Sequence, residues 1–437
     1  MSLFPDEPLR AGDLVDLTVG EAAHGGWCVA RPEQGHGQVI FVRHALPGER
    51  VRAVITQRTS KLARADAVEI VEAAAARVRP PCPHARPGGC GGCDWQHVSP
   101  PAQRALKAAV VSQQLRRIAG IEREVTVEPV AGDHDGLGWR TRVRFAVRPD
   151  GTAGLHKHRS HEVIDVGGCP IAHPLVGAAD MTGRSWPGAR WVEVSTAPAS
   201  GDRAVTVSGP GRRQLPPRGR AEAVTRRGRD GMPTAPEGGY LRQHAAGRDW
   251  RVNAAAFWQV HPGAADALAA AVLDSLRPEP GDVALDLYCG AGLFAGLLAE
   301  AVGPAGAVIG MEQDRLAVRD ARHNLRRTPW ARVHCGDTGA LLARHGLSGA
   351  SLAVLDPPRT GASRPVIDLL CGPPQTERGA ARLRRIAYVS CDPATLARDL
   401  GLLRERGWDL RALRAFDAFP MTHHVECLAT LDRGTWR

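Results

Sequence analysis

Four apolar runs in the last third of the chain each end beside an acidic residue or a glycine-bearing turn. The first, residues 283–287, is typical of a buried strand and leads through glycines into a helix-forming stretch. The carboxyl ends of parallel strands meet at one edge of a sheet, so the side chains that follow them are expected to lie together. The pattern predicts an α/β fold, with a doubly wound Rossmann-like catalytic domain over residues 251–437.

A further apolar run, residues 386–389, precedes a predicted helix start at residues 394–400. Cys391 lies between them and is followed by Asp392 and Pro393, a pair that commonly opens a helix. Cys391 is therefore expected on a turn between strand and helix, where α/β enzymes place chemistry. Partial exposure and a nearby helix N-terminus favour the nucleophilic thiolate. The alternative is a cysteine that serves as a small buried apolar residue.

The first part of the chain has a different pattern. From residue 12 to residue 72, apolar and polar positions alternate in short runs that are separated by glycine and proline. Such a pattern is typical of a small closed β-barrel. We assign this barrel to residues 1–75 and expect it to bind a partner, because it contains no catalytic set. A generic barrel with some other binding role is the alternative.

A cysteine-rich segment follows, with Cys82, Cys90 and Cys93 in a C-x7-C-x2-C spacing and Cys169 further along. Three clustered thiols and one remote thiol suit a four-cysteine metal centre. The glycines beside them let the backbone approach closely and favour an iron–sulfur centre. A zinc site is the alternative, because zinc is also held by four cysteines. We assign residues 76–250 to a central α+β domain that contains a bridging helix at residues 101–119.

Arginines recur at every second position in part of this central domain, which places them mainly on one face of a predicted strand. These residues are Arg140, Arg142, Arg144 and Arg148, and Trp139 and Phe145 flank them. Such a face can hold a phosphate backbone and stack a base. A solvated outer face is the alternative.

Charge and composition agree with a polyanionic partner. The 437 residues carry a formal net charge of +10, which favours a partner such as nucleic acid. No long apolar run or cleavable signal stands at the N-terminus, and we expect a monomeric, cytoplasmic protein with no membrane association. In that compartment ten cysteines indicate reduced thiols, metal ligands or catalysis rather than disulfides.

The predicted strand ends also indicate which ligand the catalytic domain binds. Gly290 and Gly292 let a ligand approach the backbone at a helix N-terminus, yet the turn is not G-x-G-x-x-G. Glu312 ends the second strand, where a carboxylate can bind ribose hydroxyls. Asp337 and Asp356 follow the third and fourth strands, and Asp337 could meet an adenine edge. These features favour S-adenosyl-L-methionine, and a nicotinamide enzyme is the alternative.

Two residues indicate which kind of methyl transfer the site performs. Arg359 stands after the two prolines of DPPR, where amino-group methyltransferases often carry an aromatic residue. Glu426 lies in a predicted apolar strand, and a buried carboxylate is costly unless it works or is paired. A cysteine, a carboxylate and a methyl donor together suit methylation of carbon 5 of uracil. Cys391 would add to carbon 6 and Glu426 would remove the carbon 5 proton.

With SCDP around Cys391 and HHVE ending at Glu426, the chain resembles the tRNA and 23S ribosomal RNA uracil-5-methyltransferase family over almost its whole length. The resemblance implies a class I S-adenosylmethionine-dependent RNA methyltransferase with an N-terminal TRAM domain, a small RNA-binding barrel. It implies Cys391 as nucleophile and Glu426 as base, and 23S rRNA rather than tRNA as substrate. The implied donor contacts are Gln259, Tyr288, Glu312, Asp337 and Asp356, and the implied ligands of a [4Fe-4S] cluster are Cys82, Cys90, Cys93 and Cys169.

Two alternatives remain at this stage. An RNA cytosine-5-methyltransferase uses similar chemistry but usually has a second cysteine where Arg359 stands. A non-catalytic iron–sulfur RNA-binding protein would need no nucleophile, and the presence of Cys391, Glu426 and Asp356 argues against it.

Overall fold

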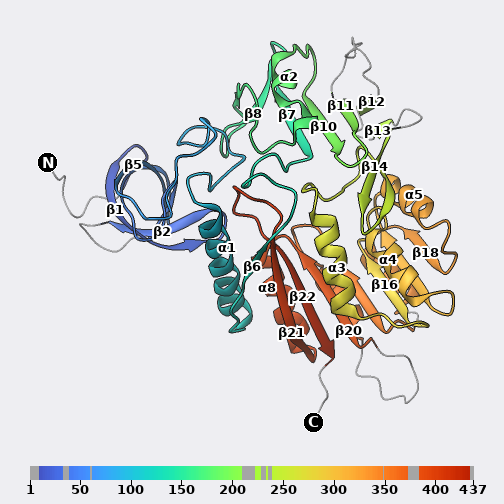
Figure 1. Ribbon diagram of the computed structural model, residues 1–437. Coiled ribbons are helices and arrows are strands. Elements are labelled where there is room, and N and C mark those ends of the chain that lie inside the picture. The colour runs from blue at the N-terminus through green and yellow to red at the C-terminus, as the bar shows by residue number, and fades with distance from the viewer. Residues whose placement is uncertain are drawn as a thin grey trace.

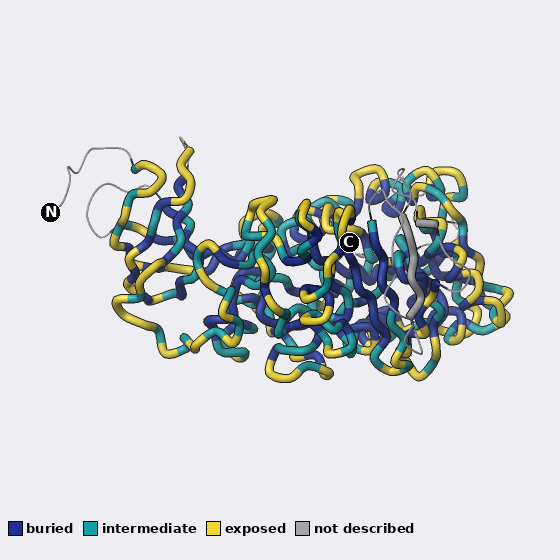
Figure 2. The backbone as a smooth tube through the Cα atoms, turned by 90° about the horizontal axis from the view of Figure 1, so that it is seen from above, coloured by how far each residue is buried: buried dark blue, intermediate teal, exposed yellow. Residues whose placement is uncertain are grey.

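The computed structural model describes residues 9–32, 39–59, 62–208, 222–227, 233–234, 239–347, 349–372 and 383–433. Figure 1 shows a barrel at the N-terminal end, a sheet from the middle of the chain, and a larger sheet with helices at the C-terminal end. In Figure 2 the buried positions run through the barrel and along the strands of the large sheet, while exposed positions gather at the outer turns.

The N-terminal strands form a closed barrel in the order β1-β2-β3-β5-β4, with β4 paired back to β1. Their inward side chains, such as Leu17 and Val19, are almost completely buried, as the alternation of apolar positions requires. The predicted barrel is confirmed. Its strands are β1 (Leu14–Ala23), β2 (Trp27–Pro32), β3 (Ile40–Arg43), β4 (Arg50–Arg58) and β5 (Ala63–Glu72).

A second sheet, in the order β13-β12-β11-β10-β7-β8-β9, is built from the middle of the chain. On its surface Arg142 and Arg144 both pair with Glu193, at 2.6 and 2.8 Å. Part of the predicted basic face is therefore neutralised. The elements are β7 (Arg142–Val147), β8 (Ala153–His156), β9 (Val163–Ile164), η2 (Pro174–Val176), α2 (Ala178–Gly183), β10 (Trp191–Ala197), β11 (Asp202–Ser208), β12 (Glu222–Arg227) and β13 (Pro233–Thr234).

The C-terminal sheet has the order β18-β17-β16-β19-β20-β22-β21-β6, and β16 to β20 run parallel. Its two faces carry separate apolar cores, one with α3, α4 and α5 and the other with α6, α7 and α8. The predicted doubly wound fold is confirmed. The hairpin β14 (Tyr240–Ala245) and β15 (Arg248–Asn253) precedes it.

The elements of this part alternate between strand and helix. They are α3 (Ala264–Leu276), β16 (Val283–Leu287), α4 (Leu293–Val302), β17 (Ala307–Glu312), α5 (Arg315–Asn324), β18 (Ala331–Cys335), α6 (Thr338–His345), β19 (Leu352–Leu355), α7 (Arg364–Cys371), β20 (Arg385–Ser390), α8 (Pro393–Glu405), β21 (Trp408–Asp417) and β22 (Glu426–Arg433). One short strand comes from far upstream: β6 (Val127–Pro129) pairs in parallel with β21 and forms an edge of the sheet.

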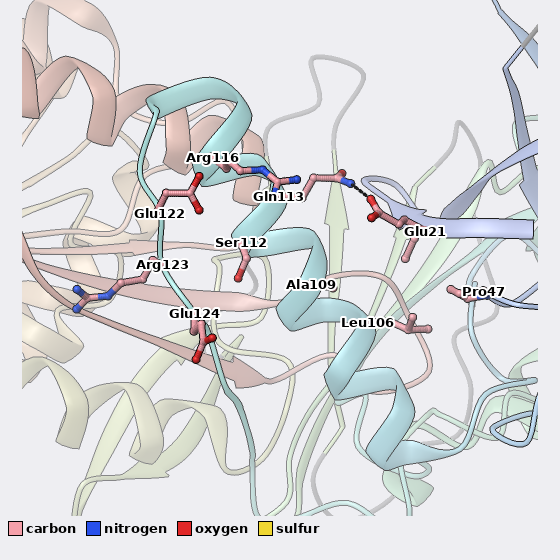
Figure 3. A pocket seen from close by; sticks show the side chains of 11 residues that line it. Glu21, Pro47, Leu106, Ala109, Ser112, Gln113, Arg116, Glu122, Arg123 and Glu124 are labelled. Carbon is pink, nitrogen blue, oxygen red and sulfur yellow. Dashed lines mark hydrogen bonds between the residues drawn. The ribbon is translucent and has the colours of Figure 1, made fainter.

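The predicted bridging helix is α1 (Pro100–Gln114), which continues into a wider turn, η1 (Leu115–Ala119). Gly120 ends it with a left-handed φ of 63°, a conformation that glycine adopts without strain. The helix lies between the barrel and α8. Figure 3 shows the cavity of about 630 Å³ that remains beside it, where Gln113 donates a hydrogen bond to Glu21 of the barrel at 3.3 Å.

Helix α1 also holds the loop between β21 and β22. The Lys107 ammonium lies 2.5 Å from the Asp417 carboxylate and donates to the carbonyl of Phe419 at 3.0 Å. The backbone N–H of Met421 donates to the Gln103 side chain at 2.8 Å. Burial lowers the pKa of Lys107, and Asp417 opposes that shift. The loop that leads to Glu426 is thus fixed by a buried ion pair.

Replacing Lys107 with methionine is expected to lower the free energy of unfolding by about 3–5 kcal/mol, because Asp417 would remain buried without its partner. Urea unfolding followed by circular dichroism measures the change. Arg52→Met, which removes an exposed pair with Asp16, is the control and should change little. Equal unfolding midpoints for Lys107→Met and the wild type would contradict the prediction.

Candidate active site

A cavity of about 720 Å³ opens at the carboxyl ends of β16, β17, β19 and β20. Six of the predicted site residues line it: Gln259, Tyr288, Glu312, Asp356, Cys391 and Glu426. Residues from the central part of the chain, Gly91, Gly92, Trp139 and Arg140, form another wall. Residues at four of the predicted strand ends thus lie in one cavity.

One end of the cavity is shaped by the turn after β16. Gly290 and Gly292 have positive φ values of 53° and 87°, which glycine adopts readily. The Glu312 carboxylate accepts hydrogen bonds from the backbone N–H groups of Gly290 at 3.0 Å and Asp314 at 2.7 Å. These two bonds orient Glu312 at the end of β17, beside the glycine turn.

Two further carboxyl groups lie beneath this turn. Asp286 accepts a hydrogen bond from the Ala295 N–H at 2.7 Å, and its other oxygen has no partner among the described residues. Burial raises the pKa of Asp286 to about 8. Burial and the nearby Glu312 raise the pKa of Asp356 to about 7. Both carboxyl groups are therefore partly protonated near neutral pH.

Asp337 does not line the cavity. It caps α6, where its carboxylate accepts the Ala340 N–H at 2.9 Å. It is nevertheless close to Tyr288, whose pKa is raised to about 12 by burial first and by Asp337 second. Its second carboxylate oxygen accepts no hydrogen bond within the described residues.

Cys391 lies on the predicted turn between β20 and α8 and is half-buried. The helix terminus does not favour its thiolate, contrary to the sequence expectation. Asp392 occupies the cap and accepts the N–H groups of Ala394 at 3.0 Å and Thr395 at 2.9 Å. Burial and then Glu426 raise the pKa of the Cys391 thiol to about 12. The group is a protonated thiol in the protein alone.

Glu426 is the first residue of β22 and has only 3% of its surface exposed. Burial raises its pKa well above the usual range, Asp356 adds to this, and Arg359 opposes it. Burial therefore favours the protonated form of this carboxyl group and increases its affinity for a proton.

Two residues at the site were not singled out as functional by the sequence. Arg359 and His424 line the cavity, and their side-chain nitrogens lie 3.3 Å apart. Burial, followed by the neighbouring His423, lowers the pKa of His424 to about 3. The ring is therefore neutral and can accept from Arg359. The available signal was the histidine pair directly before Val425 and Glu426.

The four predicted metal-ligating cysteines come near one another. Burial raises the thiol pKa values of Cys90, Cys93 and Cys169, and neighbouring cysteines contribute to each shift, with Cys82 acting on Cys90 and Cys169. The Gly92 N–H donates to the Cys90 sulfur at 3.4 Å. The donor set suits a four-cysteine centre in kind. As placed in the described ranges, however, no three cysteine, histidine or acidic side chains are grouped closely enough to hold a metal ion.

The parallel sheet, the glycine turn and the acidic strand ends define the nucleoside-binding fold of methyltransferases. A family model described as tRNA (Uracil-5-)-methyltransferase matches residues 349–434, which include Cys391 and Glu426. A TRAM domain model matches residues 8–68, and a protein-L-isoaspartate(D-aspartate) O-methyltransferase model matches residues 230–340.

Relatives align over nearly the full chain. An RNA methyltransferase of Streptomyces avermitilis is 48% identical, with 96% of this chain and 98% of the relative covered. A protein of Acidithiobacillus ferrooxidans named 23S rRNA (uracil(1939)-C(5))-methyltransferase RlmD is 33% identical, with 93% and 94% covered. The crystal structure of Pyrococcus abyssi tRNA (uracil-54, C5)-methyltransferase with S-adenosyl-L-homocysteine has a TM-score of 0.69 at 20% identity and covers 95% of this chain and 100% of its own.

This chain belongs to the RNA uracil-5-methyltransferase family. It is an S-adenosylmethionine-dependent enzyme with an N-terminal TRAM barrel, as the sequence predicted. In the part of the chain that the structure describes, no helix is long and apolar enough to cross a membrane.

The raised pKa of Asp356, which lines the cavity, predicts proton-linked donor binding. The positively charged sulfonium favours the ionised carboxylate, so binding should release a proton and tighten as pH rises through 7 to 8. Isothermal titration at pH 6 and pH 8 should give an affinity for S-adenosylmethionine that is about tenfold higher at pH 8, the factor expected for one ionisation near pH 7. S-adenosylhomocysteine lacks the sulfonium charge and serves as the control with a weaker dependence. Equal dependence for both ligands would contradict the prediction.

Proposed function

We propose that this enzyme methylates carbon 5 of a uridine in 23S ribosomal RNA. The observation that carries the proposal is the placement of Cys391 and Glu426 in one cavity with Glu312 and Asp356. Two relatives that are 33% and 32% identical are named as 23S rRNA uracil C5-methyltransferases, which supports ribosomal RNA over tRNA.

In the first step, the Cys391 thiol is proposed to lose its proton to solvent, and the resulting thiolate adds to carbon 6 of the ring. This forms a carbon–sulfur bond and places the displaced electron pair in an enolate with charge at carbon 5. Carbon 5 then attacks the methyl group of S-adenosylmethionine. The sulfur–methyl bond breaks, and the donor leaves as S-adenosylhomocysteine.

Glu426 is proposed to act as the base of the second step. Glu426 would act after its own proton has passed to solvent: its carboxylate removes the proton from carbon 5, the electron pair re-forms the ring double bond, and the bond from carbon 6 to sulfur breaks. The ring is restored as 5-methyluracil and the thiolate is regenerated. The burial of Glu426 supports this role, because it raises the proton affinity of the carboxylate.

The donor is proposed to lie along the ends of β16, β17 and β19. Glu312 would bind the ribose hydroxyls, Gln259 and Asp356 would face the methionine portion, and Tyr288 would lie near the adenine. The free carboxylate oxygen of Asp337, beside Tyr288, would reach the adenine edge. The support for these roles is the shared cavity for the first four residues and the proximity of Asp337 to Tyr288.

We further propose that Cys82, Cys90, Cys93 and Cys169 hold a [4Fe-4S] cluster. The burial of the Cys90, Cys93 and Cys169 thiols and their proximity to one another support it, since clustered buried thiols are stabilised when a metal centre takes up their charge. The cluster would supply structural cohesion to the Gly91–Gly92 wall of the cavity.

Methyl transfer is tested with the purified enzyme, tritiated S-adenosylmethionine, and unmodified 23S rRNA or tRNA, followed by nucleoside analysis. Label in 5-methyluridine from 23S rRNA is expected. Label in 5-methylcytidine would replace the proposal with cytosine methylation. Binding of RNA without label transfer would favour a non-catalytic protein.

Substitution of Glu426 by glutamine is expected to trap a covalent protein–RNA complex, because methylation can proceed while proton removal cannot. A denaturing gel with labelled RNA measures the complex. Cys391→Ser is the matched control, since it should give neither complex nor 5-methyluridine but still bind S-adenosylmethionine. Normal turnover by Glu426→Gln without a trapped species would exclude Glu426 as the base.

Protein purified without oxygen is expected to contain about four iron and four sulfide per chain, the composition of a [4Fe-4S] cluster. Cys90→Ala should lose most of this iron and unfold at a lower temperature. Cys28→Ala changes a cysteine of the barrel core and is the control, with its iron retained. Zinc in the anaerobic protein, at one per chain, would contradict an iron–sulfur centre.

A further inference from the structure

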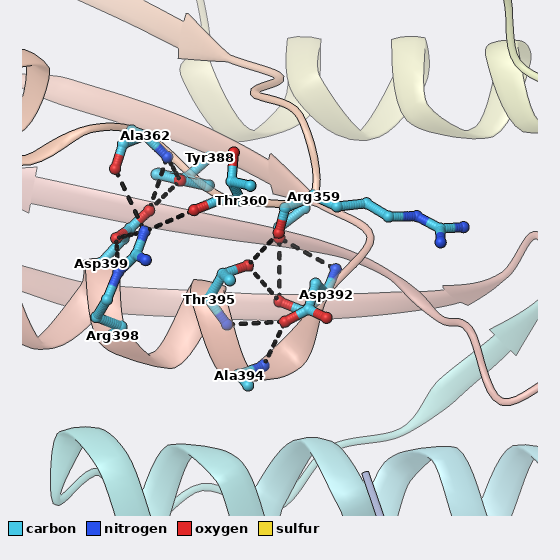
Figure 4. Close-up of polar contacts among 10 residues, drawn as sticks. Arg359, Thr360, Ala362, Tyr388, Asp392, Ala394, Thr395, Arg398 and Asp399 are labelled. Atoms are coloured by element: carbon cyan, nitrogen blue, oxygen red, sulfur yellow. Dashed lines mark hydrogen bonds and ion pairs between the residues drawn. The ribbon is translucent and has the colours of Figure 1, made fainter. Parts of the chain in front are cut away.

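A buried carboxylate on α8 connects that helix with the loop after β19. Asp399 is fully buried, and one of its oxygens accepts hydrogen bonds from the Tyr388 hydroxyl at 2.5 Å and the Ala362 N–H at 2.9 Å. Its other oxygen accepts from the Arg398 side chain at 2.8 Å. Burial raises the pKa of Asp399, and the bonds from Tyr388 and Arg398 oppose that shift. Figure 4 shows these groups converging on Asp399.

Additional bonds fasten the same loop to α8. The Arg398 guanidinium donates to the carbonyls of Thr360 at 2.9 Å and Ala362 at 3.3 Å. The Thr395 hydroxyl donates to the carbonyl of Arg359 at 3.1 Å. Gly361 has a φ of 77°, and a Cβ there would lie 2.5 Å from an Asp399 oxygen. Several hydrogen bonds thus hold the loop from 359 to 362 against α8, and position 361 has no space for a side chain.

This loop carries the Arg359 side chain into the catalytic cavity. Figure 4 shows that side chain extending away from the network around Asp399. Arg359 and Cys391 both line the cavity, whereas Asp399 and Tyr388 do not. Asp399 can therefore influence the chemistry only through the groups that it holds.

Arg359 is the cation that opposes a negative surrounding at the thiol. Glu426 on β22, Asp356 after β19 and the adjacent Asp392 each raise the pKa of Cys391, and Arg359 lowers it. Two histidines complete the neighbouring groups: His24 of the barrel pairs with Asp392 at 3.3 Å, and His424 contacts Arg359.

We propose that Asp399 is a positioning residue that holds the Arg359 guanidinium beside the Cys391 sulfur, where its positive charge stabilises the thiolate. Asp399 acts by fixing the loop between Arg359 and Ala362 against α8. The inference deepens the proposed function, and its catalytic meaning rests on Cys391 being the nucleophile. The reactivity of the thiol itself can be measured without RNA.

The test is the rate at which iodoacetamide alkylates Cys391, followed by mass spectrometry of the peptide that contains it, between pH 7 and pH 10. Arg359→Gln should slow alkylation about tenfold at a given pH, the effect of raising the thiol pKa by about one unit. Asp399→Asn should slow it severalfold. The double variant should react no more slowly than Arg359→Gln alone, because both changes act through one guanidinium.

Asp282→Asn is the matched control. Asp282 accepts hydrogen bonds from the Ser351 hydroxyl at 2.7 Å and Arg384 at 2.8 Å. It directly precedes β16, at the amino ends of the parallel strands, whereas the cavity lies at their carboxyl ends. This variant should lower the unfolding temperature and leave the alkylation rate of Cys391 unchanged. Tyr388→Phe removes one bond to Asp399, and it repeats the cycle if Asp399→Asn does not fold.

Multiplicative slowing in the double variant, or an unchanged rate in Asp399→Asn and Tyr388→Phe, would overturn the proposal. The outcome is separable from that of the proposed function. A wild-type enzyme that forms no 5-methyluridine, with the alkylation cycle as expected, would refute the function and retain the positioning role. An enzyme that forms 5-methyluridine, but whose Cys391 alkylation rate is unchanged by Asp399→Asn and Tyr388→Phe, would retain the proposed function and refute the positioning role.

Discussion

The carboxylate of Asp94 is the point at which the three parts of the chain meet. It accepts a hydrogen bond from His423, in the loop between β21 and β22, at 2.6 Å and lies 3.3 Å from Arg43 of the barrel. Although burial opposes ionisation, the bond from His423 holds the pKa of Asp94 at about 2. A charge buried in this way is stable only with its partners in place. Because Asp94 directly follows Cys93, the cysteine segment, the barrel and the loop before Glu426 are mutually dependent.

Burial raises the pKa of three groups at the candidate site, Asp356, Glu426 and the Cys391 thiol. In the proposed mechanism, the sulfonium of the donor would offset the charge of the carboxylates and Arg359 would offset that of the sulfur. Such a site is protected from unproductive alkylation or oxidation of its thiol, since the thiolate is the reactive form.

Sequence patterns predicted the parts of this enzyme that depend on local periodicity. The barrel, the strand ends and the turn that carries Cys391 all follow from short-range alternation and helix-start signals. The raised pKa of the Cys391 thiol could not be predicted in this way. Asp392 accepts the hydrogen bonds of the helix amides, and the carboxyl groups of Glu426 and Asp356, which raise the pKa, come from other strands. Pairs such as Lys107 and Asp417, which are 310 residues apart, leave no local trace. The four-cysteine metal centre stays a prediction, because the described residues include no group of three cysteine, histidine or acidic side chains close enough to hold a metal ion.

The pairing of β6 with β21 makes the catalytic sheet depend on a segment from the N-terminal half of the chain. Without β6, the strand β21 would present an open row of backbone donors and acceptors, which is a template for aggregation. The segment that covers this edge is synthesised almost 300 residues earlier than β21. The methyltransferase sheet is therefore not a portable unit that could be exchanged by simple truncation or fusion. During synthesis, β6 can join the sheet only after β21 has been made.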